Sequence, residues 1–588
     1  FAADTQIPGD TDGDGATDAT PVVAIPEAAN GVNAEELKDG VQTEVTVPKG
    51  SAAGDTLTLT VTRPDGTTDT VEHTLSADEV TAGKSDVTIP ADKVTADGQY
   101  SVTAEITDPA GNTSGQGQPT DFTVDTQIPG DTDGDGVVDA TPVVTIPEAA
   151  NGVNAEELKD GVQTEVTVPK GSAAGDTLTL TVTRPDGTTD TVEHTLTADE
   201  VTAGKADVTI PADKVTADGQ YSVTAEITDP AGNTSGQGQP TDFTVDTQIP
   251  GDTDGDGVVD ATPVVTIPEA ANGVNAEELK DGVQTEVTVP KGSAAGDTLT
   301  LTVTRPDGTT DTVEHTLTAD EVTAGKADVT IPADKVTADG QYSVTAEITD
   351  PAGNTSGQGQ PTDFTVDTQI PGDTDGDGVV DATPVVAIPE AANGVNAEEL
   401  KDGVQTEVTV PKGSAAGDTL TLTVTRPDGT TDTVEHTLTA DEVTAGKAAV
   451  TIPADKVTAD GQYSVTAEIT DPAGNTSGQG QPADFAVDTV APSAPVLKAE
   501  DDGSVSVDLP GDANKGDTVD VTFEDEKGGK HTVTLEKGDN GWTSSDPTLI
   551  PDSTGDKATI PADNVKDNSE VTAIAKDPSG NESDPSTV

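Results

Sequence analysis

The sequence contains no cysteine and no methionine, and aromatic residues make up only 2% of it. Without cysteine, disulfides, thiolate metal sites and cysteine nucleophiles are excluded. Basic residues are also scarce, with 28 Lys and Arg against 109 Asp and Glu, which gives a formal net charge of -81. Because phosphate groups are bound by basic patches, this balance excludes nucleic acid as a natural partner, and it also argues against docking on anionic lipid.

The chain also lacks an uninterrupted apolar run of the ~18 residues that a membrane span needs, so we expect no direct membrane insertion. It begins without a methionine or a signal peptide. Its first residues, FAADTQIPGD, match FTVDTQIPGD at 122–131, so we expect a piece cut from a longer repeat array. Chains this acidic and poor in aromatics are often disordered, but many carboxylates also bind divalent cations, which offsets their repulsion.

A long repeat organises the sequence. The stretch DTQIPGDTDGDG begins at Asp4, Asp125, Asp246 and Asp367, and the sequence between these points is almost identical. The period far exceeds the roughly 20–50 residues of a solenoid unit, so each copy is a whole domain. We expect four domains at 4–124, 125–245, 246–366 and 367–487, followed by a shorter, divergent domain at 488–588.

Each copy alternates polar and apolar residues in short segments rich in Thr and Val, which indicates half-buried strands rather than disorder. In the second copy these segments are 141–146, 162–168, 176–183, 189–197, 206–210, 221–228 and 241–245. Only NAEELKDG at 154–161 suggests a helical turn. Seven short strands in about 100 residues predict an all-β protein, a tandem array of immunoglobulin-like Greek-key β-sandwiches arranged end to end.

A single tyrosine in each copy supports this fold. Tyr221 follows ADGQ and opens the sixth predicted strand, where a tyrosine corner would bond back to the upstream main chain. The equivalent residues are Tyr100, Tyr342 and Tyr463, and the fifth domain has no tyrosine but contains Trp542. A structural role is therefore favoured over a catalytic one.

The linker DTDGDGVVDATP at 131–142 spaces its aspartates as the first half of an EF-hand loop does. Such hard oxygen ligands suit Ca²⁺. Position twelve is Pro142 rather than Glu, so Asp139 at position nine is expected to close the shell; the alternative is a solvated acidic linker. The candidate ligands are Asp10, Asp12, Asp14, Asp18, Asp131, Asp133, Asp135, Asp139, Asp252, Asp254, Asp256, Asp260, Asp373, Asp375, Asp377 and Asp381.

A second acidic cluster, PEAANGVNAEELKD at 147–160, is either part of a cation site or a surface turn capped by Asn154 and Glu157. In a sandwich, the loop after the first strand and the end of the last strand share one pole, and the DPAGN loop lies at the other. Glu148 and Asn151 are therefore expected to meet linker Asp246 and Asp350 of the next copy around a cation that fixes the angle between the domains. The equivalent candidates are Glu27, Asp108, Asp125, Asp229, Glu269, Asp367, Glu390, Asp471, Asp488 and Asp577.

The motifs DPAGNTS, DPSGNES, DTVAPSAPVL and ADGQYSVTAEITD, together with the repeat array, resemble the immunoglobulin-like extender repeats of giant bacterial surface adhesins of the biofilm-associated and RTX types. The resemblance covers the whole chain. It implies a secreted, calcium-rigidified stalk at the bacterial cell surface, whose partners are calcium ions and neighbouring repeats. The stalk would project a distal domain, outside this sequence, that binds the adhesion ligand and serves biofilm formation. Copies one to four depart from the family by replacing the short DTVAP linker with DTQIPGDTDGDGVVDATP.

Two alternatives compete with the stalk. An enzyme is disfavoured, because no Ser-His-Asp order, HExxH or phosphate-binding glycine loop is present and only Trp542 offers a ring to stack on a sugar. The five histidines, expected to be surface or cross-strand residues, are His73, His194, His315, His436 and His531. A cadherin-like module that adheres through its own surface would need exposed aromatics or arginines, and the only arginines are Arg63, Arg184, Arg305 and Arg426.

Overall fold

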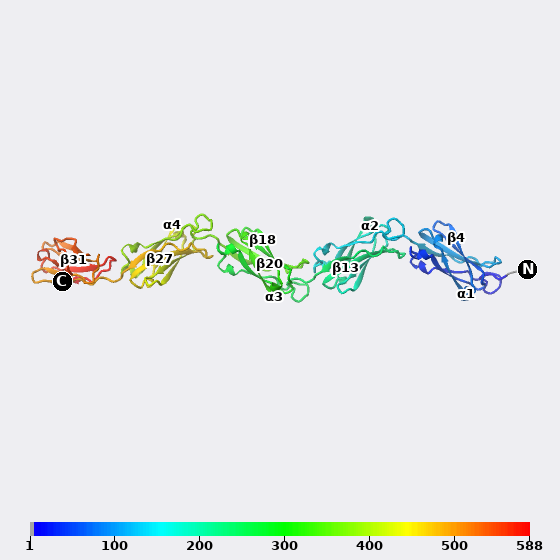
Figure 1. The fold of residues 1–588 in the computed structure, drawn as a ribbon, viewed down its shortest axis with the longest axis horizontal. Coiled ribbons are helices and arrows are strands. Elements are labelled where there is room, and N and C mark those ends of the chain that lie inside the picture. The colour runs from blue at the N-terminus through cyan, green and yellow to red at the C-terminus, as the bar shows by residue number, and fades with distance from the viewer. Residues whose placement is uncertain (1–4) are drawn as a thin grey trace.

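The computed structural model describes residues 5–588, which form five units in a row from the N-terminus to the C-terminus (Figure 1). Each unit has its own hydrophobic core. We number the units 1 to 5 in chain order. The domain limits expected from the repeat are kept as a proposal, and Asp4, the first residue of the first expected domain, lies outside the described residues.

Unit 2 contains the seven expected strands, with bounds within a few residues of those predicted. They are β8 (Val144–Thr145), β9 (Val162–Thr167), β10 (Thr177–Thr183), β11 (Thr189–Thr195), β12 (Lys205–Ile210), β13 (Gly219–Thr228) and β14 (Thr241–Val245). The first strand is much shorter than expected.

Units 1, 3 and 4 repeat this arrangement. Unit 1 has β1 (Val23–Ala24), β2 (Val41–Thr46), β3 (Thr56–Thr62), β4 (Thr68–Thr74), β5 (Lys84–Ile89), β6 (Gly98–Thr107) and β7 (Thr120–Val124). Unit 3 has β15 (Val265–Thr266), β16 (Val283–Thr288), β17 (Thr298–Thr304), β18 (Thr310–Thr316), β19 (Lys326–Ile331), β20 (Gly340–Thr349) and β21 (Thr362–Val366). Unit 4 has β22 (Val386–Ala387), β23 (Val404–Thr409), β24 (Thr419–Thr425), β25 (Thr431–Thr437), β26 (Lys447–Ile452), β27 (Gly461–Thr470) and β28 (Ala483–Val487).

Two antiparallel sheets face each other in each unit. In unit 2 they have the orders β8-β9-β12 and β11-β10-β13-β14. The fourth strand pairs with the third, whereas in a constant-type immunoglobulin domain it joins the other sheet. The apolar residues of β10, Leu178, Leu180 and Val182, are fully buried between the sheets, and the threonines between them face outward. The all-β immunoglobulin-like prediction is confirmed.

The tyrosine corner is present in all four long units. In unit 2 the buried Tyr221 hydroxyl donates to the Ala217 carbonyl oxygen at 2.8 Å and accepts from the Ala217 amide at 3.1 Å. The ring stacks on Phe243 with centroids 5.3 Å apart. The hydroxyl therefore satisfies two main-chain groups that would otherwise be costly to bury.

One α-helix in each long unit was not predicted from the sequence. The helices are α1 (Ala77–Ala82), α2 (Ala198–Ala203), α3 (Ala319–Ala324) and α4 (Ala440–Ala445). Thr197 begins α2 with a capping box, in which its hydroxyl accepts from the Glu200 amide at 3.3 Å and Glu200 accepts from the Thr197 amide at 2.8 Å. The spacing Thr-x-x-Glu was the signal that could have revealed it.

Short 3-10 helices occupy the poles of the units. They are η1 (Pro26–Ala29), η2 (Glu36–Asp39), η3 (Ala91–Lys93), η4 (Pro147–Ala150), η5 (Glu157–Asp160), η6 (Ala212–Lys214), η7 (Pro268–Ala271), η8 (Glu278–Asp281), η9 (Ala333–Lys335), η10 (Pro389–Ala392), η11 (Glu399–Asp402), η12 (Ala454–Lys456) and η13 (Ala562–Asn564). The expected helical turn at 154–161 is η5. Asn154 caps it by accepting from the Glu157 amide at 3.0 Å.

Unit 5 has the strands β29 (Val496–Ala499), β30 (Val505–Asp508), β31 (Thr518–Glu524), β32 (Lys530–Gly538), β33 (Gly541–Ser544), β34 (Lys557–Ile560), β35 (Thr572–Lys576) and β36 (Ser586–Thr587). Trp542 on β33 is 1% exposed, so it belongs to the core of the unit and offers no platform for a sugar. Within residues 5–588, no helix is long and apolar enough to cross a membrane.

Candidate metal centre at the junctions between units

The aspartate-rich linker is fastened to the unit that follows it. The Gly130 amide donates to the Lys170 carbonyl oxygen at 2.8 Å, and the Gln127 side-chain amide donates to the Gly171 carbonyl oxygen at 3.1 Å. Gly171 has φ +90°, and a Cβ there would lie 2.6 Å from the Ile128 carbonyl oxygen. Glycine is thus required for the linker to pack this closely.

Three carboxylates of the linker loop lie together. Asp131, Asp133 and Asp139 each offer an oxygen, and these oxygens are all within 4.8 Å of one another. The same grouping occurs for Asp10, Asp12 and Asp18, for Asp252, Asp254 and Asp260, and for Asp373, Asp375 and Asp381. The fourth predicted carboxylate, Asp135, stays outside the group and accepts from the Val137 amide at 2.9 Å. The residues equivalent to Asp135, which also accept from a main-chain amide two residues on, are Asp14, Asp256 and Asp377.

Main-chain donors keep this loop folded despite its charge. Asp131 accepts from the amides of Gly134 at 2.7 Å and Gly136 at 2.8 Å. The hydrogen bonds from Gly136 and Gly134 hold the pKa of the Asp131 carboxyl below its ordinary value. Asp139 accepts from the amide and the hydroxyl of Thr132 at 3.0 and 2.6 Å. The loop is therefore preorganised by hydrogen bonds to Asp131 and Asp139.

A second acidic group lies between consecutive units. Between units 2 and 3 it contains the half-buried linker Asp246, the buried Asp350 of unit 3 and the exposed Asp218 of unit 2. Burial raises the pKa of Asp246, and the charges of Asp350 and Asp218 raise it further. Linker Asp246 and Asp350 thus lie close enough to repel each other, as the sequence predicts for this pair.

Sequence reasoning missed a member of this group. Asp297, directly before β17, is 2% exposed, and its pKa is raised by burial and then by the charges of Asp350 and Asp246. Asp297 lies two residues before Leu299, so strand alternation places it on the buried face, which is the signal that was overlooked. The equivalent residues in units 2, 4 and 5 are Asp176, Asp418 and Asp517.

The other predicted ligands are placed differently. Glu148 accepts from the Gln163 amide at 3.2 Å within its own unit. Glu27, Glu269 and Glu390 make the same local bond. Asp350 accepts from the amide and the side chain of Asn354 at 2.8 and 2.7 Å, and the aspartates bonded to asparagine in the same way are Asp108, Asp229, Asp471 and Asp577.

Direct hydrogen bonds also cross the junction. Asn151 and Asn154 of unit 2 donate their side-chain amides to the Ala352 carbonyl oxygen of unit 3, at 3.0 and 3.3 Å. The Ala155 amide donates to the Asn354 side-chain oxygen at 2.8 Å, and Asn354 donates to the Asp246 carbonyl oxygen at 2.8 Å. We call this set of bonds the asparagine latch. Asn151 therefore meets the next unit, but through its amide nitrogen and a carbonyl rather than through its oxygen.

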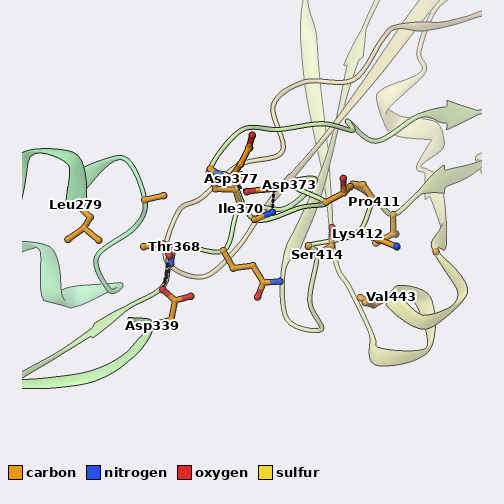
Figure 2. A pocket seen from close by; sticks show the side chains of 18 of the residues that line it. Leu279, Asp339, Thr368, Ile370, Asp373, Asp377, Pro411, Lys412, Ser414 and Val443 are labelled. Carbon is orange, nitrogen blue, oxygen red and sulfur yellow. Dashed lines mark hydrogen bonds between the residues drawn. The ribbon is translucent and has the colours of Figure 1, made fainter. Parts of the chain in front are cut away.

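The linker is tied to the preceding unit as well. The amide and hydroxyl of Thr247 both donate to Asp218, at 2.9 and 2.8 Å. Figure 2 shows the equivalent pair, Thr368 and Asp339, beside a groove of about 1260 Å³ between units 3 and 4. Asp373 and Asp377 of the linker loop line this groove, so the loop carboxylates face open space.

The donor set at these junctions fits a hard divalent cation. Every charged candidate is a carboxylate, and oxygen ligands are what Ca²⁺ takes. At the last junction one oxygen of Asp517 is buried and has no hydrogen-bond partner, although Asp577 and Asp488 lie close enough to raise the pKa of Asp517 after burial itself. A cation would satisfy this oxygen and offset the charges around it. Ligation itself stays a prediction for every candidate residue.

The pKa shifts predict how acid acts on the metal-free chain. Between the ordinary pKa of 3.8 and the raised pKa values, the folded chain binds more protons than the unfolded chain. The aspartates with raised pKa values are Asp125, Asp176, Asp246, Asp297, Asp367, Asp418 and Asp517. Stability contributed by this protonation is lost as pH rises through that window. Calorimetry in chelator should therefore show a melting temperature that increases as pH is lowered from neutral into the window.

Below the ordinary carboxyl pKa the trend should reverse. Carboxylates with lowered pKa values, such as Asp131, lose their stabilising hydrogen bonds when they are protonated. The metal-free chain should then be most stable at mildly acidic pH, and saturating calcium should remove the decline toward neutral pH. A melting temperature that climbs steadily from the window to neutral pH in chelator would contradict the assignment.

Comparisons with known proteins agree with this architecture. The profile of the bacterial Ig-like domain matches residues 11–126, 142–247, 263–368 and 394–489. No curated protein sequence matches the chain.

Three solved structures are similar to parts of the chain. The crystal structure of a tetra-tandem repeat in the extending region of a large adhesion protein is 18% identical, covers 80% of this chain and 99% of that chain, and has a TM-score of 0.27. A Ca²⁺-stabilised adhesin that helps an Antarctic bacterium bind ice is 24% identical, with coverages of 80% and 100% and a TM-score of 0.25. A structure on host cell surface retention of a 1.5-MDa bacterial ice-binding adhesin is 23% identical, with coverages of 60% and 99% and a TM-score of 0.22.

All three TM-scores are low. The profile matches, in contrast, cover most of the sequence and fall on the four near-identical units with their paired sheets. This chain belongs to the bacterial Ig-like domain family.

Proposed function

We propose that this chain is a calcium-stiffened extender of a large bacterial surface adhesin. It lies outside the cell and holds a distal ligand-binding domain away from the cell surface. The observation that carries the proposal is the recurrence of one acidic junction at all four boundaries between units that lie end to end (Figure 1).

The surface of the units favours a spacer over an adhesive module of the cadherin kind. Every aromatic ring within residues 5–588 is buried in a core. Arg184 is held within its unit by an ion pair to Asp190 at 2.5 Å, and its counterparts in units 1, 3 and 4 make the same pair. Binding hot spots are rich in exposed aromatics and arginine, which this surface does not present.

A catalytic role has little support either. His194 on β11 is hydrogen-bonded to Glu200 of α2 at 2.8 Å, and each of the other four histidines is bonded to a carboxylate six residues away. These pairs connect a strand to the turn or helix beside it, as expected of cross-strand surface residues. We therefore propose a mechanical, non-catalytic role.

Calorimetric titration of the full chain with calcium tests the proposal. We expect saturable binding with at least two classes of site, because the linker loop and the buried junction group differ in exposure and charge. Changing Asp12, Asp133, Asp254 and Asp375 to Asn should abolish the loop class and leave the junction class, since each loop loses one of three clustered carboxylates.

The matched control makes the same change of charge on exposed strand positions, with Asp121, Asp242, Asp363 and Asp484 changed to Asn. This variant should bind calcium as the parent does. No saturable heat at millimolar calcium, or equal losses in both variants, would refute the proposal.

A further inference from the structure

The four long units share an Asn-Gly dipeptide at the pole that faces the next unit. The pairs are Asn30-Gly31, Asn151-Gly152, Asn272-Gly273 and Asn393-Gly394, and a fifth pair, Asn540-Gly541, lies in the turn between β32 and β33, away from any junction. Asn-Gly is the dipeptide most prone to deamidation, because glycine has no side chain to shield its amide nitrogen.

The fold requires both residues of the pair. Gly152 has φ +100°, and a Cβ there would lie 2.8 Å from the Thr244 hydroxyl oxygen and 3.7 Å from the Ala352 Cβ of unit 3. Any other residue would be strained and would clash with Thr244 of its own unit. Asn151 is required because its side chain donates to the Ala352 carbonyl oxygen across the junction at 3.0 Å. Close packing of two units thus places a labile dipeptide at their contact.

The closed junction turns the reactive group away. Deamidation needs the Asn151 side-chain carbonyl carbon to approach the Gly152 nitrogen, whereas the latch holds that side chain toward unit 3. The segment after it is also fixed, since the Val153 amide donates to the Thr244 carbonyl oxygen at 2.8 Å. Only an open junction leaves the Asn151 side chain free to turn back.

We propose that these four Asn-Gly pairs are modification sites at which transient opening of a junction becomes permanent through deamidation. The glycine nitrogen bonds to the asparagine Cγ, its proton leaves with the side-chain nitrogen as ammonia, and a five-membered succinimide forms. Water then opens the ring at either carbonyl, giving aspartate or isoaspartate. No enzyme or cofactor is needed, and the proposal does not rest on calcium binding.

The product cannot rebuild the latch. Aspartate offers only oxygens to the Ala352 carbonyl, so a hydrogen bond is replaced by repulsion. Its new charge joins Asp218, Asp246, Asp297 and Asp350 at the same junction. Isoaspartate adds a methylene to the main chain beside Gly152 and displaces it from its close fit against Thr244. An opened and modified junction therefore stays loose.

Peptide mapping by mass spectrometry of the full chain, aged at mildly alkaline pH, tests this. Tryptic peptides that carry Asn30 and Asn393 differ in sequence from each other and from those of units 2 and 3, so both sites are resolved. In the folded parent, Asn30 should deamidate at least ten-fold more slowly than in the urea-unfolded chain. Asn233→Ala removes the bond from the Ala34 amide at 2.9 Å and the bond to the Asp125 carbonyl at 2.9 Å. It should accelerate Asn30 several-fold.

Two controls accompany this variant. Asn354→Ala makes the same change one junction further on and should leave Asn30 at the parent rate. Asp97→Ala opens the first junction from the other side, by removing the bonds from Thr126 at 3.0 and 2.8 Å, and should accelerate Asn30 even if Asn233→Ala disturbs unit 2. In every variant Asn540 should keep the parent rate. Equal rates at Asn30 in folded and unfolded chain, or no acceleration in either opening variant, would overturn the proposal.

The product is tested at the last junction, where the linker sequence is unique. The Ala397 amide of unit 4 donates to the Asn581 side-chain oxygen of unit 5 across that junction at 2.8 Å, so its hydrogen exchange reports opening. Asn393→Asp should speed this exchange several-fold, and Asn540→Asp, with the same chemistry away from the junction, should not. Unchanged exchange in Asn393→Asp would show that the modification has no structural consequence and would refute the second half of the proposal.

Discussion

In calcium, we expect small-angle scattering to show the full chain as a straight rod, and replacement of the four linker aspartates to shorten it. The ten-residue strand β13 spans about 33 Å at ~3.3 Å per residue, so five units in line extend on the order of 200 Å. Changing Asp125, Asp246, Asp367 and Asp488 to Ala should shorten the maximum dimension by about one unit length, roughly 35 Å. The reason is that bending occurs at the junctions, since each sandwich has a packed core of its own.

The same variant should lose its response to chelator. In the parent, removing calcium leaves Asp246 facing Asp350 and Asp218, and this repulsion works against the asparagine latch. In the variant the linker charge is gone, so the asparagine latch acts alone. The scattering profile should therefore be alike with and without calcium. The exposed control, with Asp121, Asp242, Asp363 and Asp484 changed to Asn, should behave as the parent. If the linker variant stays as long and calcium-sensitive as the parent, the carboxylates are a solubilising coat and the junction assignment is wrong.

The second large effect is expected at the buried aspartates that precede the third strand of units 2 to 5. A cation that binds only the folded state stabilises it by about 2.7 kcal/mol at a hundred times its dissociation constant. For units of about 100 residues this corresponds to an increase in melting temperature of about 10–20 °C. Chelator should therefore lower the calorimetric melting temperature of the parent by about that amount.

Changing Asp176, Asp297, Asp418 and Asp517 to Asn should raise the melting temperature in chelator and remove most of the increase that calcium gives. The amide is neutral and of the same shape, so the metal-free chain no longer buries four carboxylates that repel neighbouring aspartates and should melt at a higher temperature than the metal-free parent. Calcium should add little, because the buried carboxylate is lost. The single change Asp517→Asn gives the clearest reading, since the buried Trp542 reports the melting of unit 5 by fluorescence. A variant that melts lower in chelator and still gains the full calcium increment would exclude these aspartates from the site.

The strands and the linker loop were accessible from the sequence because both depend on short-range patterns. Alternation in TLTLTVT places Leu178 and Leu180 on one face of a strand whatever the rest of the chain does. The loop is folded by short-range hydrogen bonds, which Gly134 and Gly136 donate to Asp131 and Thr132 donates to Asp139. The tyrosine corner likewise connects Tyr221 to a residue four positions earlier. Helix α2 was not predicted, although its capping box, Thr197 with Glu200, is equally local and its spacing is visible in the sequence.

The junction group, in contrast, was decided by the tertiary structure. Strand alternation indicates that Asp297 is buried, but only the closing of the sandwich brings it beside Asp350 and linker Asp246. Glu148 was expected at the junction because it shares a pole with Asn151, but the start of β9 provides the Gln163 amide and holds it within its own unit. The latch between Asn151 and the Ala352 carbonyl joins residues 201 positions apart and involves a main-chain group, which carries no mark in the sequence. Periodicity and turn chemistry settled what each unit is, whereas burial and main-chain geometry at the contact settled which of its many carboxylates face one another.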